Sequence, residues 1–290
     1  MRGALTAVTD LADLVEGDAE TADEDEIAAA HYSMFGFNVF PHASVFLEED
    51  GFLGKGVTES ARAFYERSGL FESDGREAAD HITTELLFCS RISDNAREMA
   101  RFCDRHLFAW LPTFVFAIER QNNPFYRRLA RLTLDVITAH RKSLLDQKSL
   151  LDQKSPSEYH VDPHQSSSSV QSVCRDDSIL KKQWTDQFSV AGKCGLFLSR
   201  GDIMNLARAL RLPTGFGGRI QMLRTMFDSS ETYGREKDVA AGLLHLCDQE
   251  ITSWQAVLDD NPPVALVVWS EQWLAKLRSS RNLVQENQHL

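Results

Sequence analysis

The chain has 290 residues, which is enough for one large or two ordinary domains with a sizeable buried core. Hydrophobic residues make up 43% of it and charged residues 25%, and this balance excludes a fibrous or a fully disordered chain. Asp and Glu number 42 against 31 Lys and Arg, so the formal net charge is -11. That charge disfavours non-specific binding to nucleic acid or anionic lipid and favours a cationic partner.

Signals for a membrane span, for secretion and for metal binding are absent from the sequence. No apolar run reaches the roughly 18 residues that cross a bilayer, and the N-terminus lacks the apolar region of a secretory signal. The five cysteines lie far apart with no Cys-x-x-Cys among them, which is typical of free thiols in a reducing compartment. We therefore expect a cytoplasmic protein without membrane insertion, bound metal or a disulfide framework.

The first half of the chain is predicted to contain an acidic N-terminal segment, residues 1–26, and then a helical block over residues 27–141. Apolar residues recur three and four apart in this block, with turn residues between the runs. One predicted helix ends at Gly69, where a left-handed cap suits glycine. Another begins at Asn123-Pro124, a cap and first-turn pair.

A low-complexity segment follows, in which the unit KSLLDQ is repeated and serines cluster at 166–169. It has little apolar surface to bury, so residues 142–178 are predicted to be a mobile linker between two domains. Residues 179–290 are predicted to form a second helical block, with helices over 202–211 and 218–227 and longer ones after them. The last of these carries Trp269 and Trp273 one turn apart. Neither block shows strand alternation, so the predicted fold class is all-α.

Catalytic and cofactor motifs are absent, and the segment that could carry chemistry is 77–88. The sequence predicts a helix that opens at Glu77 and places Asp80 in its first turn, where the helix dipole favours a negative charge. His81 and Glu85 are four residues apart, so their side chains are predicted to meet on one face. From spacing alone this group could be structural, bind a ligand such as a cationic peptide, or do acid–base chemistry.

Several short motifs occur in a set order over residues 27–141. The segment His31-Tyr32-Ser33-Met34-Phe35 is similar to an aromatic-x-x-Leu-Phe motif, and the segment from Phe40 to Leu47 is similar to Pro-x-x-Ser-x-x-Leu. Asp80-His81-Ile82 resembles the end of a Glu-Pro-x-Asp-His-Leu signature. In order and spacing these motifs resemble the TorD/DmsD family of chaperones for molybdenum-containing oxidoreductases, the redox enzyme maturation proteins. Further matching residues are Tyr65, Gly69, His106, Leu107, Trp110, Pro112, Phe125 and Tyr126.

The resemblance implies a TorD-like helical bundle and a chaperone with no catalytic residues and no cofactor of its own. Such a chaperone binds the twin-arginine signal peptide and the apo form of a molybdopterin oxidoreductase catalytic subunit, until the cofactor is inserted before export. An acidic surface would attract the paired arginines, and aromatic residues would line an apolar groove. The expected peptide-binding residues are Phe46, Tyr65, Asp80, His81, Glu85 and Trp110. The oligomeric state stays open, with a homodimer among the alternatives, and so does the role of the second block.

Two other functions stay open at this point. The helices within 202–227 could form a helix-turn-helix regulator that binds nucleic acid, because arginines outnumber acidic residues between Ser199 and Phe227. These arginines are Arg200, Arg208, Arg211, Arg219 and Arg224. Against this, the turn between them is longer than usual and the net charge of the chain repels DNA. The other alternative is an enzyme that acts on a small molecule through Asp80 and His81.

Overall fold

The computed structural model describes residues 23–51, 53–69, 77–151 and 177–287. These residues form helices and connecting turns without any β-strand, so the predicted all-α fold is confirmed. The helices of the first half are α2 (Glu24–His31), η1 (Tyr32–Asn38), α3 (Ala43–Leu47), α4 (Lys55–Ser68), α5 (Ile82–Ile92), α6 (Ala96–Phe102), η2 (Cys103–Leu107), α7 (Phe108–Glu119) and α8 (Pro124–Leu151). Those of the second half are α9 (Asp177–Phe188), α10 (Ala191–Cys194), α11 (Arg200–Ala209), α12 (Arg219–Thr232), α13 (Glu236–Asp259) and α14 (Val264–Asn287).

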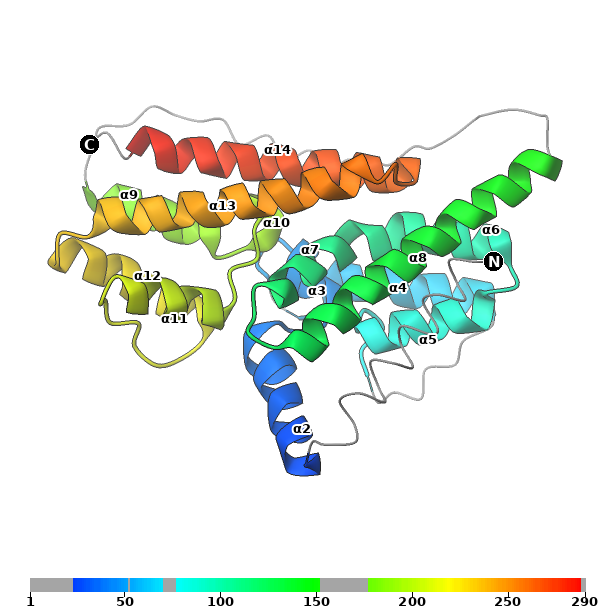
Figure 1. The fold of residues 1–290 in the computed structure, drawn as a ribbon, viewed down its shortest axis with the longest axis horizontal. Coiled ribbons are helices and arrows are strands. Elements are labelled where there is room, and N and C mark those ends of the chain that lie inside the picture. The colour runs from blue at the N-terminus through cyan, green and yellow to red at the C-terminus, as the bar shows by residue number, and fades with distance from the viewer. Residues whose placement is uncertain (1–22, 52, 70–76, 152–176, 288–290) are drawn as a thin grey trace.

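The first described helix, α2, points away from the body of the molecule (Figure 1). Asp23 caps it by accepting a hydrogen bond from the N–H of Asp25, and the three acidic residues of its first turn suit the positive end of the helix dipole. No residue of α2 is buried. We call α2 and η1 together the N-terminal arm. The arm begins inside the predicted acidic segment, of which residues 1–22 lie outside the described part of the chain.

The helix boundaries predicted from turn residues are confirmed at two places. Gly69 follows α4 in a left-handed conformation, with φ of 62°. Pro124 is the first residue of α8, and the side chain of Asn123 accepts a hydrogen bond of 3.0 Å from the N–H of Tyr126. In both places the local sequence settles the helix end, because a left-handed cap and a fixed N-terminal φ depend on single residues.

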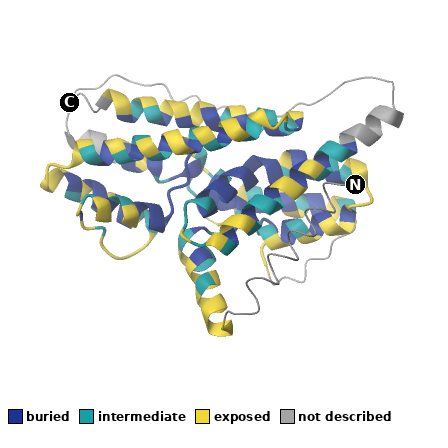
Figure 2. Ribbon diagram, in the orientation of Figure 1, coloured by how far each residue is buried: buried dark blue, intermediate teal, exposed yellow. Residues whose placement is uncertain are grey.

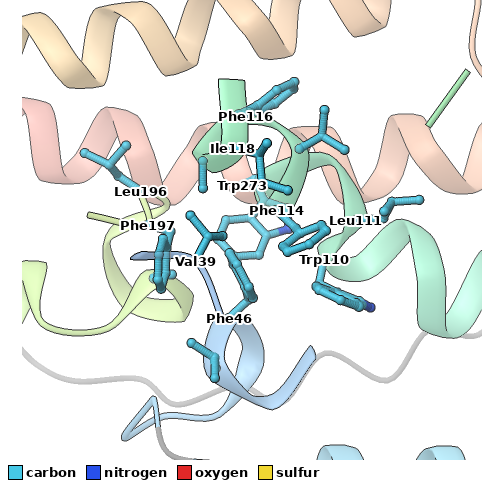
Figure 3. Packing of buried hydrophobic residues seen from close by; sticks show 14 of the residues in the cluster. Val39, Phe46, Trp110, Leu111, Phe114, Phe116, Ile118, Leu196, Phe197 and Trp273 are labelled. Atoms are coloured by element: carbon cyan, nitrogen blue, oxygen red, sulfur yellow. The ribbon is translucent and has the colours of Figure 1, made fainter. Parts of the chain in front are cut away.

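The core is built around α7, in which every residue from Phe108 to Ile118 is buried (Figure 2). Helices from both halves of the chain pack against it. Phe46 of α3 lies with its ring 5.6 Å from that of Trp110 in α7 and 4.7 Å from that of Phe197, which follows α10 (Figure 3). The two predicted helical blocks therefore share one hydrophobic core.

Two tryptophans of α14 bind the backbone around the start of α7. The indole N–H of Trp269 donates to the carbonyl of Asp104 at 2.8 Å, and that of Trp273 donates to the carbonyl of Ala109 at 2.9 Å. The backbone there is a π-helix, η2, in which the N–H of Phe108 bonds to Cys103, five residues back. In a regular α-helix that N–H would bond to Asp104, so the π-helix leaves this carbonyl available to Trp269.

The predicted linker, residues 142–178, is described only at its ends. Helix α8 continues to Leu151, so the helix reaches further than the predicted end of the first block, and α9 begins at Asp177. The ammonium group of Lys142 donates to the carbonyl of Asp260, which joins α8 to the end of α13. Residues 152–176 lie outside the described part of the chain, and the division into domains stays a prediction.

Candidate functional site

Two of the sequence motifs meet in space although they are almost forty residues apart. His42 and His81 form an isolated antiparallel bridge between the segment before α3 and the segment before α5. The N–H of Ala43 donates to the carbonyl of Asp80 and the N–H of Ile82 donates to the carbonyl of Pro41, both at 2.9 Å. The Pro-x-x-Ser segment and the Asp-His segment thus form one structural unit, which we call the motif junction.

The carboxylate of Asp80 lies at the centre of this junction, and its side chain is 1% exposed. It accepts hydrogen bonds of 2.9 Å from the N–H of Ser44 and 2.8 Å from the hydroxyl of Thr58. Ser44 lies in the first turn of α3, whose free N–H groups need acceptors. The prediction that Asp80 lies in the first turn of its own helix is wrong, because α5 begins at Ile82. Asp80 instead caps α3, which it meets only in the folded chain.

The predicted contact between the side chains of His81 and Glu85 is also not formed. His81 is the N-cap of α5 and has extended backbone angles, φ of -76° and ψ of 138°, so its side chain does not follow the spacing of the helix face. Its ring nitrogen Nδ1 accepts a hydrogen bond of 3.2 Å from the N–H of Thr83. The carboxyl group of Glu85 accepts a hydrogen bond of 3.0 Å from the indole N–H of Trp110.

Glu85 is 1% exposed and lies in the aromatic core. Burial raises the pKa of the Glu85 carboxyl well above its usual range, although the hydrogen bond from Trp110 lowers it. The carboxyl group is therefore held in its neutral form across a pH range in which an exposed glutamate is charged. Glu85 thus makes a structural contact between α5 and α7.

Replacing Glu85 by Gln is expected to stabilise the protein at pH 8 and to change stability little at pH 4. The unfolded chain ionises near the ordinary pKa of 4.5 whereas the folded chain keeps the proton, so the stability of the wild type falls as the pH rises above that value. Glutamine keeps the acceptor for Trp110 and cannot ionise. Urea denaturation at both pH values measures the difference in unfolding free energy between variant and wild type, and Glu66→Gln, at an exposed position of α4, is the control. An effect of Glu85→Gln that is equal at pH 4 and pH 8 would contradict the prediction.

The surface of the motif junction carries two imidazole rings. The rings of His42 and His81 lie 4.7 Å apart, edge to face, and their side chains are 17% and 15% exposed. Burial lowers the pKa of each histidine below its usual value, which favours the neutral form of both rings. Nε2 of His81 lies 4.0 Å from the carboxylate of exposed Glu77, and Nδ1 of His42 is buried without a hydrogen bond. This pair offers neutral hydrogen-bonding groups at the edge of a buried network.

The three aromatic residues predicted to contact a peptide are enclosed in the core. Phe46 and Trp110 are 0% exposed and Tyr65 is 2% exposed, with its hydroxyl donating to the carbonyl of Ala79 at 2.7 Å. A peptide would reach them only after the helices rearrange. Of the six predicted peptide-binding residues, His81 alone is partly exposed, and the peptide-binding role of all six stays a prediction.

A pair of exposed aromatic residues lies on the N-terminal arm. Tyr32 is 62% exposed and Phe37 is 40% exposed, and their rings lie 4.8 Å apart. Both belong to η1, a π-helix of the kind that often occurs at functional sites. The guanidinium group of Arg200 lies over the ring of Phe37 at 5.2 Å. Tyr32 is part of the first sequence motif, but its exposure could not be predicted because the α-helical spacing fails in a π-helix.

The fold gives the residues behind the enzyme and helix-turn-helix hypotheses other surroundings than the sequence suggested. Nδ1 of His42 lies 4.0 Å from a carboxylate oxygen of Asp80, and among the described residues no hydrogen bond joins Asp80 to an imidazole ring. The predicted helices of 202–227 are present as α11 and α12, but the guanidinium group of Arg219 points inward and donates to the carbonyl of Ser189 at 2.6 Å. No helix in the described ranges has both the length and the apolarity that crossing a membrane requires.

The comparisons with known proteins concern the part of the chain that contains the motif junction. Residues 2–115 match the family model of the nitrate reductase delta subunit. The resemblance to the TorD-like redox enzyme maturation family is confirmed. The match begins before residue 27 and ends before residue 141, so its boundaries differ from the predicted ones.

A selenate reductase assembly chaperone protein of Thauera selenatis is 32% identical to this chain over 107 residues. The aligned part is 32% of this chain and 55% of that protein, so the chain spans about half the length of the relative. None of the solved structures matches the chain. Residues 179–290, the predicted second helical block, lie outside the family match.

Proposed function

We propose that the protein is a cytoplasmic, non-catalytic chaperone for a molybdopterin-containing oxidoreductase. In this proposal it binds the signal peptide and the apo form of the catalytic subunit, and it holds the subunit until the cofactor is inserted before export. The match of residues 2–115 to the delta subunit family carries the proposal, and the similarity to a selenate reductase assembly chaperone protein supports it.

We further propose that a twin-arginine signal peptide first binds the N-terminal arm. The exposed rings of Tyr32 and Phe37 offer an apolar surface, and the exposed carboxylates at 24–26 lie on the same arm. Paired arginines would face these carboxylates, and the apolar segment of the peptide would cover the two rings. This arrangement needs no opening of the core, in contrast to binding at Phe46 or Trp110.

Replacing Tyr32 by Ser is expected to weaken peptide binding about tenfold, because exposed aromatic residues dominate the binding energy of such surfaces. The measurement is calorimetric titration with a synthetic peptide that carries two adjacent arginines followed by a leucine-rich segment. Tyr233→Ser is a matched control, since Tyr233 is equally exposed at 62% but lies at the end of α12. Equal loss in both variants, or none in either, would contradict the assignment of the arm.

His81→Ala in the same titration tests the motif junction. We expect weaker binding of the peptide with a folded protein, because His81 makes one hydrogen bond to its own helix and is partly exposed. Unchanged affinity would assign His81 to the structure of the junction only.

A salt series separates the two parts of the peptide. Raising the ionic strength screens exposed charges over roughly 8 Å at physiological salt and less above it, while apolar contacts persist. At high salt, deleting the leucine-rich segment is therefore expected to weaken binding more than replacing the arginines by glutamine. If binding is lost at high salt and deleting the leucine-rich segment does not change the affinity, the protein is only an acidic surface and the chaperone proposal fails.

A further inference from the structure

An open cleft of about 620 Å³ lies between the end of α7 and helices α11 and α13. Phe116, Asp202 and Glu250 are its buried residues, while exposed polar residues such as Asn205 and His245 line it nearer the solvent. All of them come after residue 115, so the cleft lies outside the family match and away from the motif junction. This position makes it independent of the proposed function.

An arginine at the end of α7 organises the floor of the cleft. The guanidinium group of Arg120 donates to a carboxylate oxygen of Asp202 at 3.5 Å, to Oε2 of Glu250, and to the carbonyl of Phe197 at 2.6 Å. The same oxygen of Asp202 accepts a hydrogen bond of 2.9 Å from the N–H of Ser199, which caps α11. Each of the three nitrogens of Arg120 therefore already has an acceptor.

The second oxygen of Glu250 has no such partner. The side chain of Glu250 is 0% exposed, and among the described residues no group donates to Oε1. A buried acceptor without a donor is costly, and buried polar groups are nearly always hydrogen-bonded. Burial raises the pKa of Glu250 to about 7, although Arg120 lowers it. The carboxyl group of this cleft-lining side chain thus has one oxygen held by Arg120, and its other oxygen lacks a donor among the described residues.

The charges around the cleft favour a cation. Arg120 faces two carboxylates, those of Asp202 and Glu250, so one negative charge remains when Glu250 is ionised. Glu119, which also lines the cleft, is paired with Arg131 through two hydrogen bonds of 2.7 Å and adds no net charge. An anion would meet this excess of carboxylates, whereas a guanidinium or ammonium group would supply both the missing donor and the missing charge.

We propose that this cleft binds an organic cation, a guanidinium or ammonium group, whose N–H donates to Oε1 of Glu250. The buried ring of Phe116 supplies an apolar wall for the alkyl part of such a ligand. The cation can be a side chain that a partner protein presents or a free small molecule, and both present the same chemistry to the cleft.

The test is calorimetric titration of the full chain at pH 8, where Glu250 is ionised, with four probes. They are capped tetrapeptides with two central arginines, two lysines or two glutamines, and free ethylguanidinium. We expect an arginine or lysine probe to bind the wild type and the glutamine peptide not to bind. If ethylguanidinium binds and neither cationic peptide binds, the ligand of the cleft is a free small molecule, which still agrees with the proposal.

Two variants decide whether binding occurs in the cleft. Glu250→Gln is expected to weaken cation binding at least about tenfold, because it removes the charge with little change in shape. Asn205→Trp is expected to do the same by filling the cleft from its exposed rim, and it decides the question if the first variant does not fold. Glu271→Gln, on the exposed face of α14, is the control. Three results would overturn the proposal: cation binding that neither cleft variant weakens, no binding of any cation, or binding of the glutamine peptide as tight as that of the cationic peptides.

Discussion

Asp80→Ala is expected to lower the free energy of unfolding by about 3 kcal/mol, since it leaves two buried donors without an acceptor. Those donors are the N–H of Ser44 and the hydroxyl of Thr58, at 2.9 and 2.8 Å from the carboxylate. A charged acceptor makes each of these hydrogen bonds stronger than a neutral pair. Urea denaturation followed by circular dichroism measures the change.

Thr58→Val is the matched control for this variant. It keeps the shape of the side chain and removes one of the two hydrogen bonds, so we expect a loss of about 1 kcal/mol. Asp80 is 0% exposed, which makes its carboxylate part of the core. If Asp80→Ala costs no more than Thr58→Val, the carboxylate does not hold the motif junction together.

Arg141→Met is expected to destabilise the protein by about 4 kcal/mol, the cost typical of leaving one member of a buried ion pair without its partner. Arg141 of α8 donates to both carboxylate oxygens of Asp104 in η2, at 2.8 and 2.7 Å. The two side chains are 4% and 8% exposed, so Asp104 would be left as a buried charge. The measurement is again the free energy of unfolding in urea.

The double replacement of Asp104 by Leu and Arg141 by Met separates charge from packing. Apolar side chains of similar volume often replace a buried ion pair at little cost, so we expect the double variant to lie within about 1 kcal/mol of the wild type. Arg101→Met, which breaks the exposed pair with Glu98, is expected to cost less than about 1 kcal/mol. A double variant as unstable as Arg141→Met would mean that packing, and not the uncompensated charge, causes the loss.

The sequence predicts most of the helices because their signals are local. Apolar spacing indicates α13 and α14, and single residues such as Gly69 and Pro124 settle helix ends through their own backbone preferences. The order of short motifs also sufficed to identify the family resemblance over the first block. None of these inferences needs a contact between distant residues.

The start of α5 shows where local signals fail. Helix propensity favoured an opening at Glu77, yet the helix begins at Ile82 because the preceding residues pair with the segment before α3. That pairing turns Asp80 toward Ser44 and Thr58 and separates His81 from Glu85. The candidate residues were thus found from sequence, while their environments were not.

The sequence by itself determined the all-α class, the positions of most helices and the resemblance of the first block, because these depend on spacing and on single residues. Only the tertiary structure decided which groups are buried and which are exposed. It enclosed Phe46 and Trp110, exposed Tyr32, and placed Glu250 beside Arg120, 130 residues away along the chain. Burial and charge pairing arise from contacts between distant segments, and the energy of a buried carboxylate depends on those neighbours rather than on its own position in the sequence.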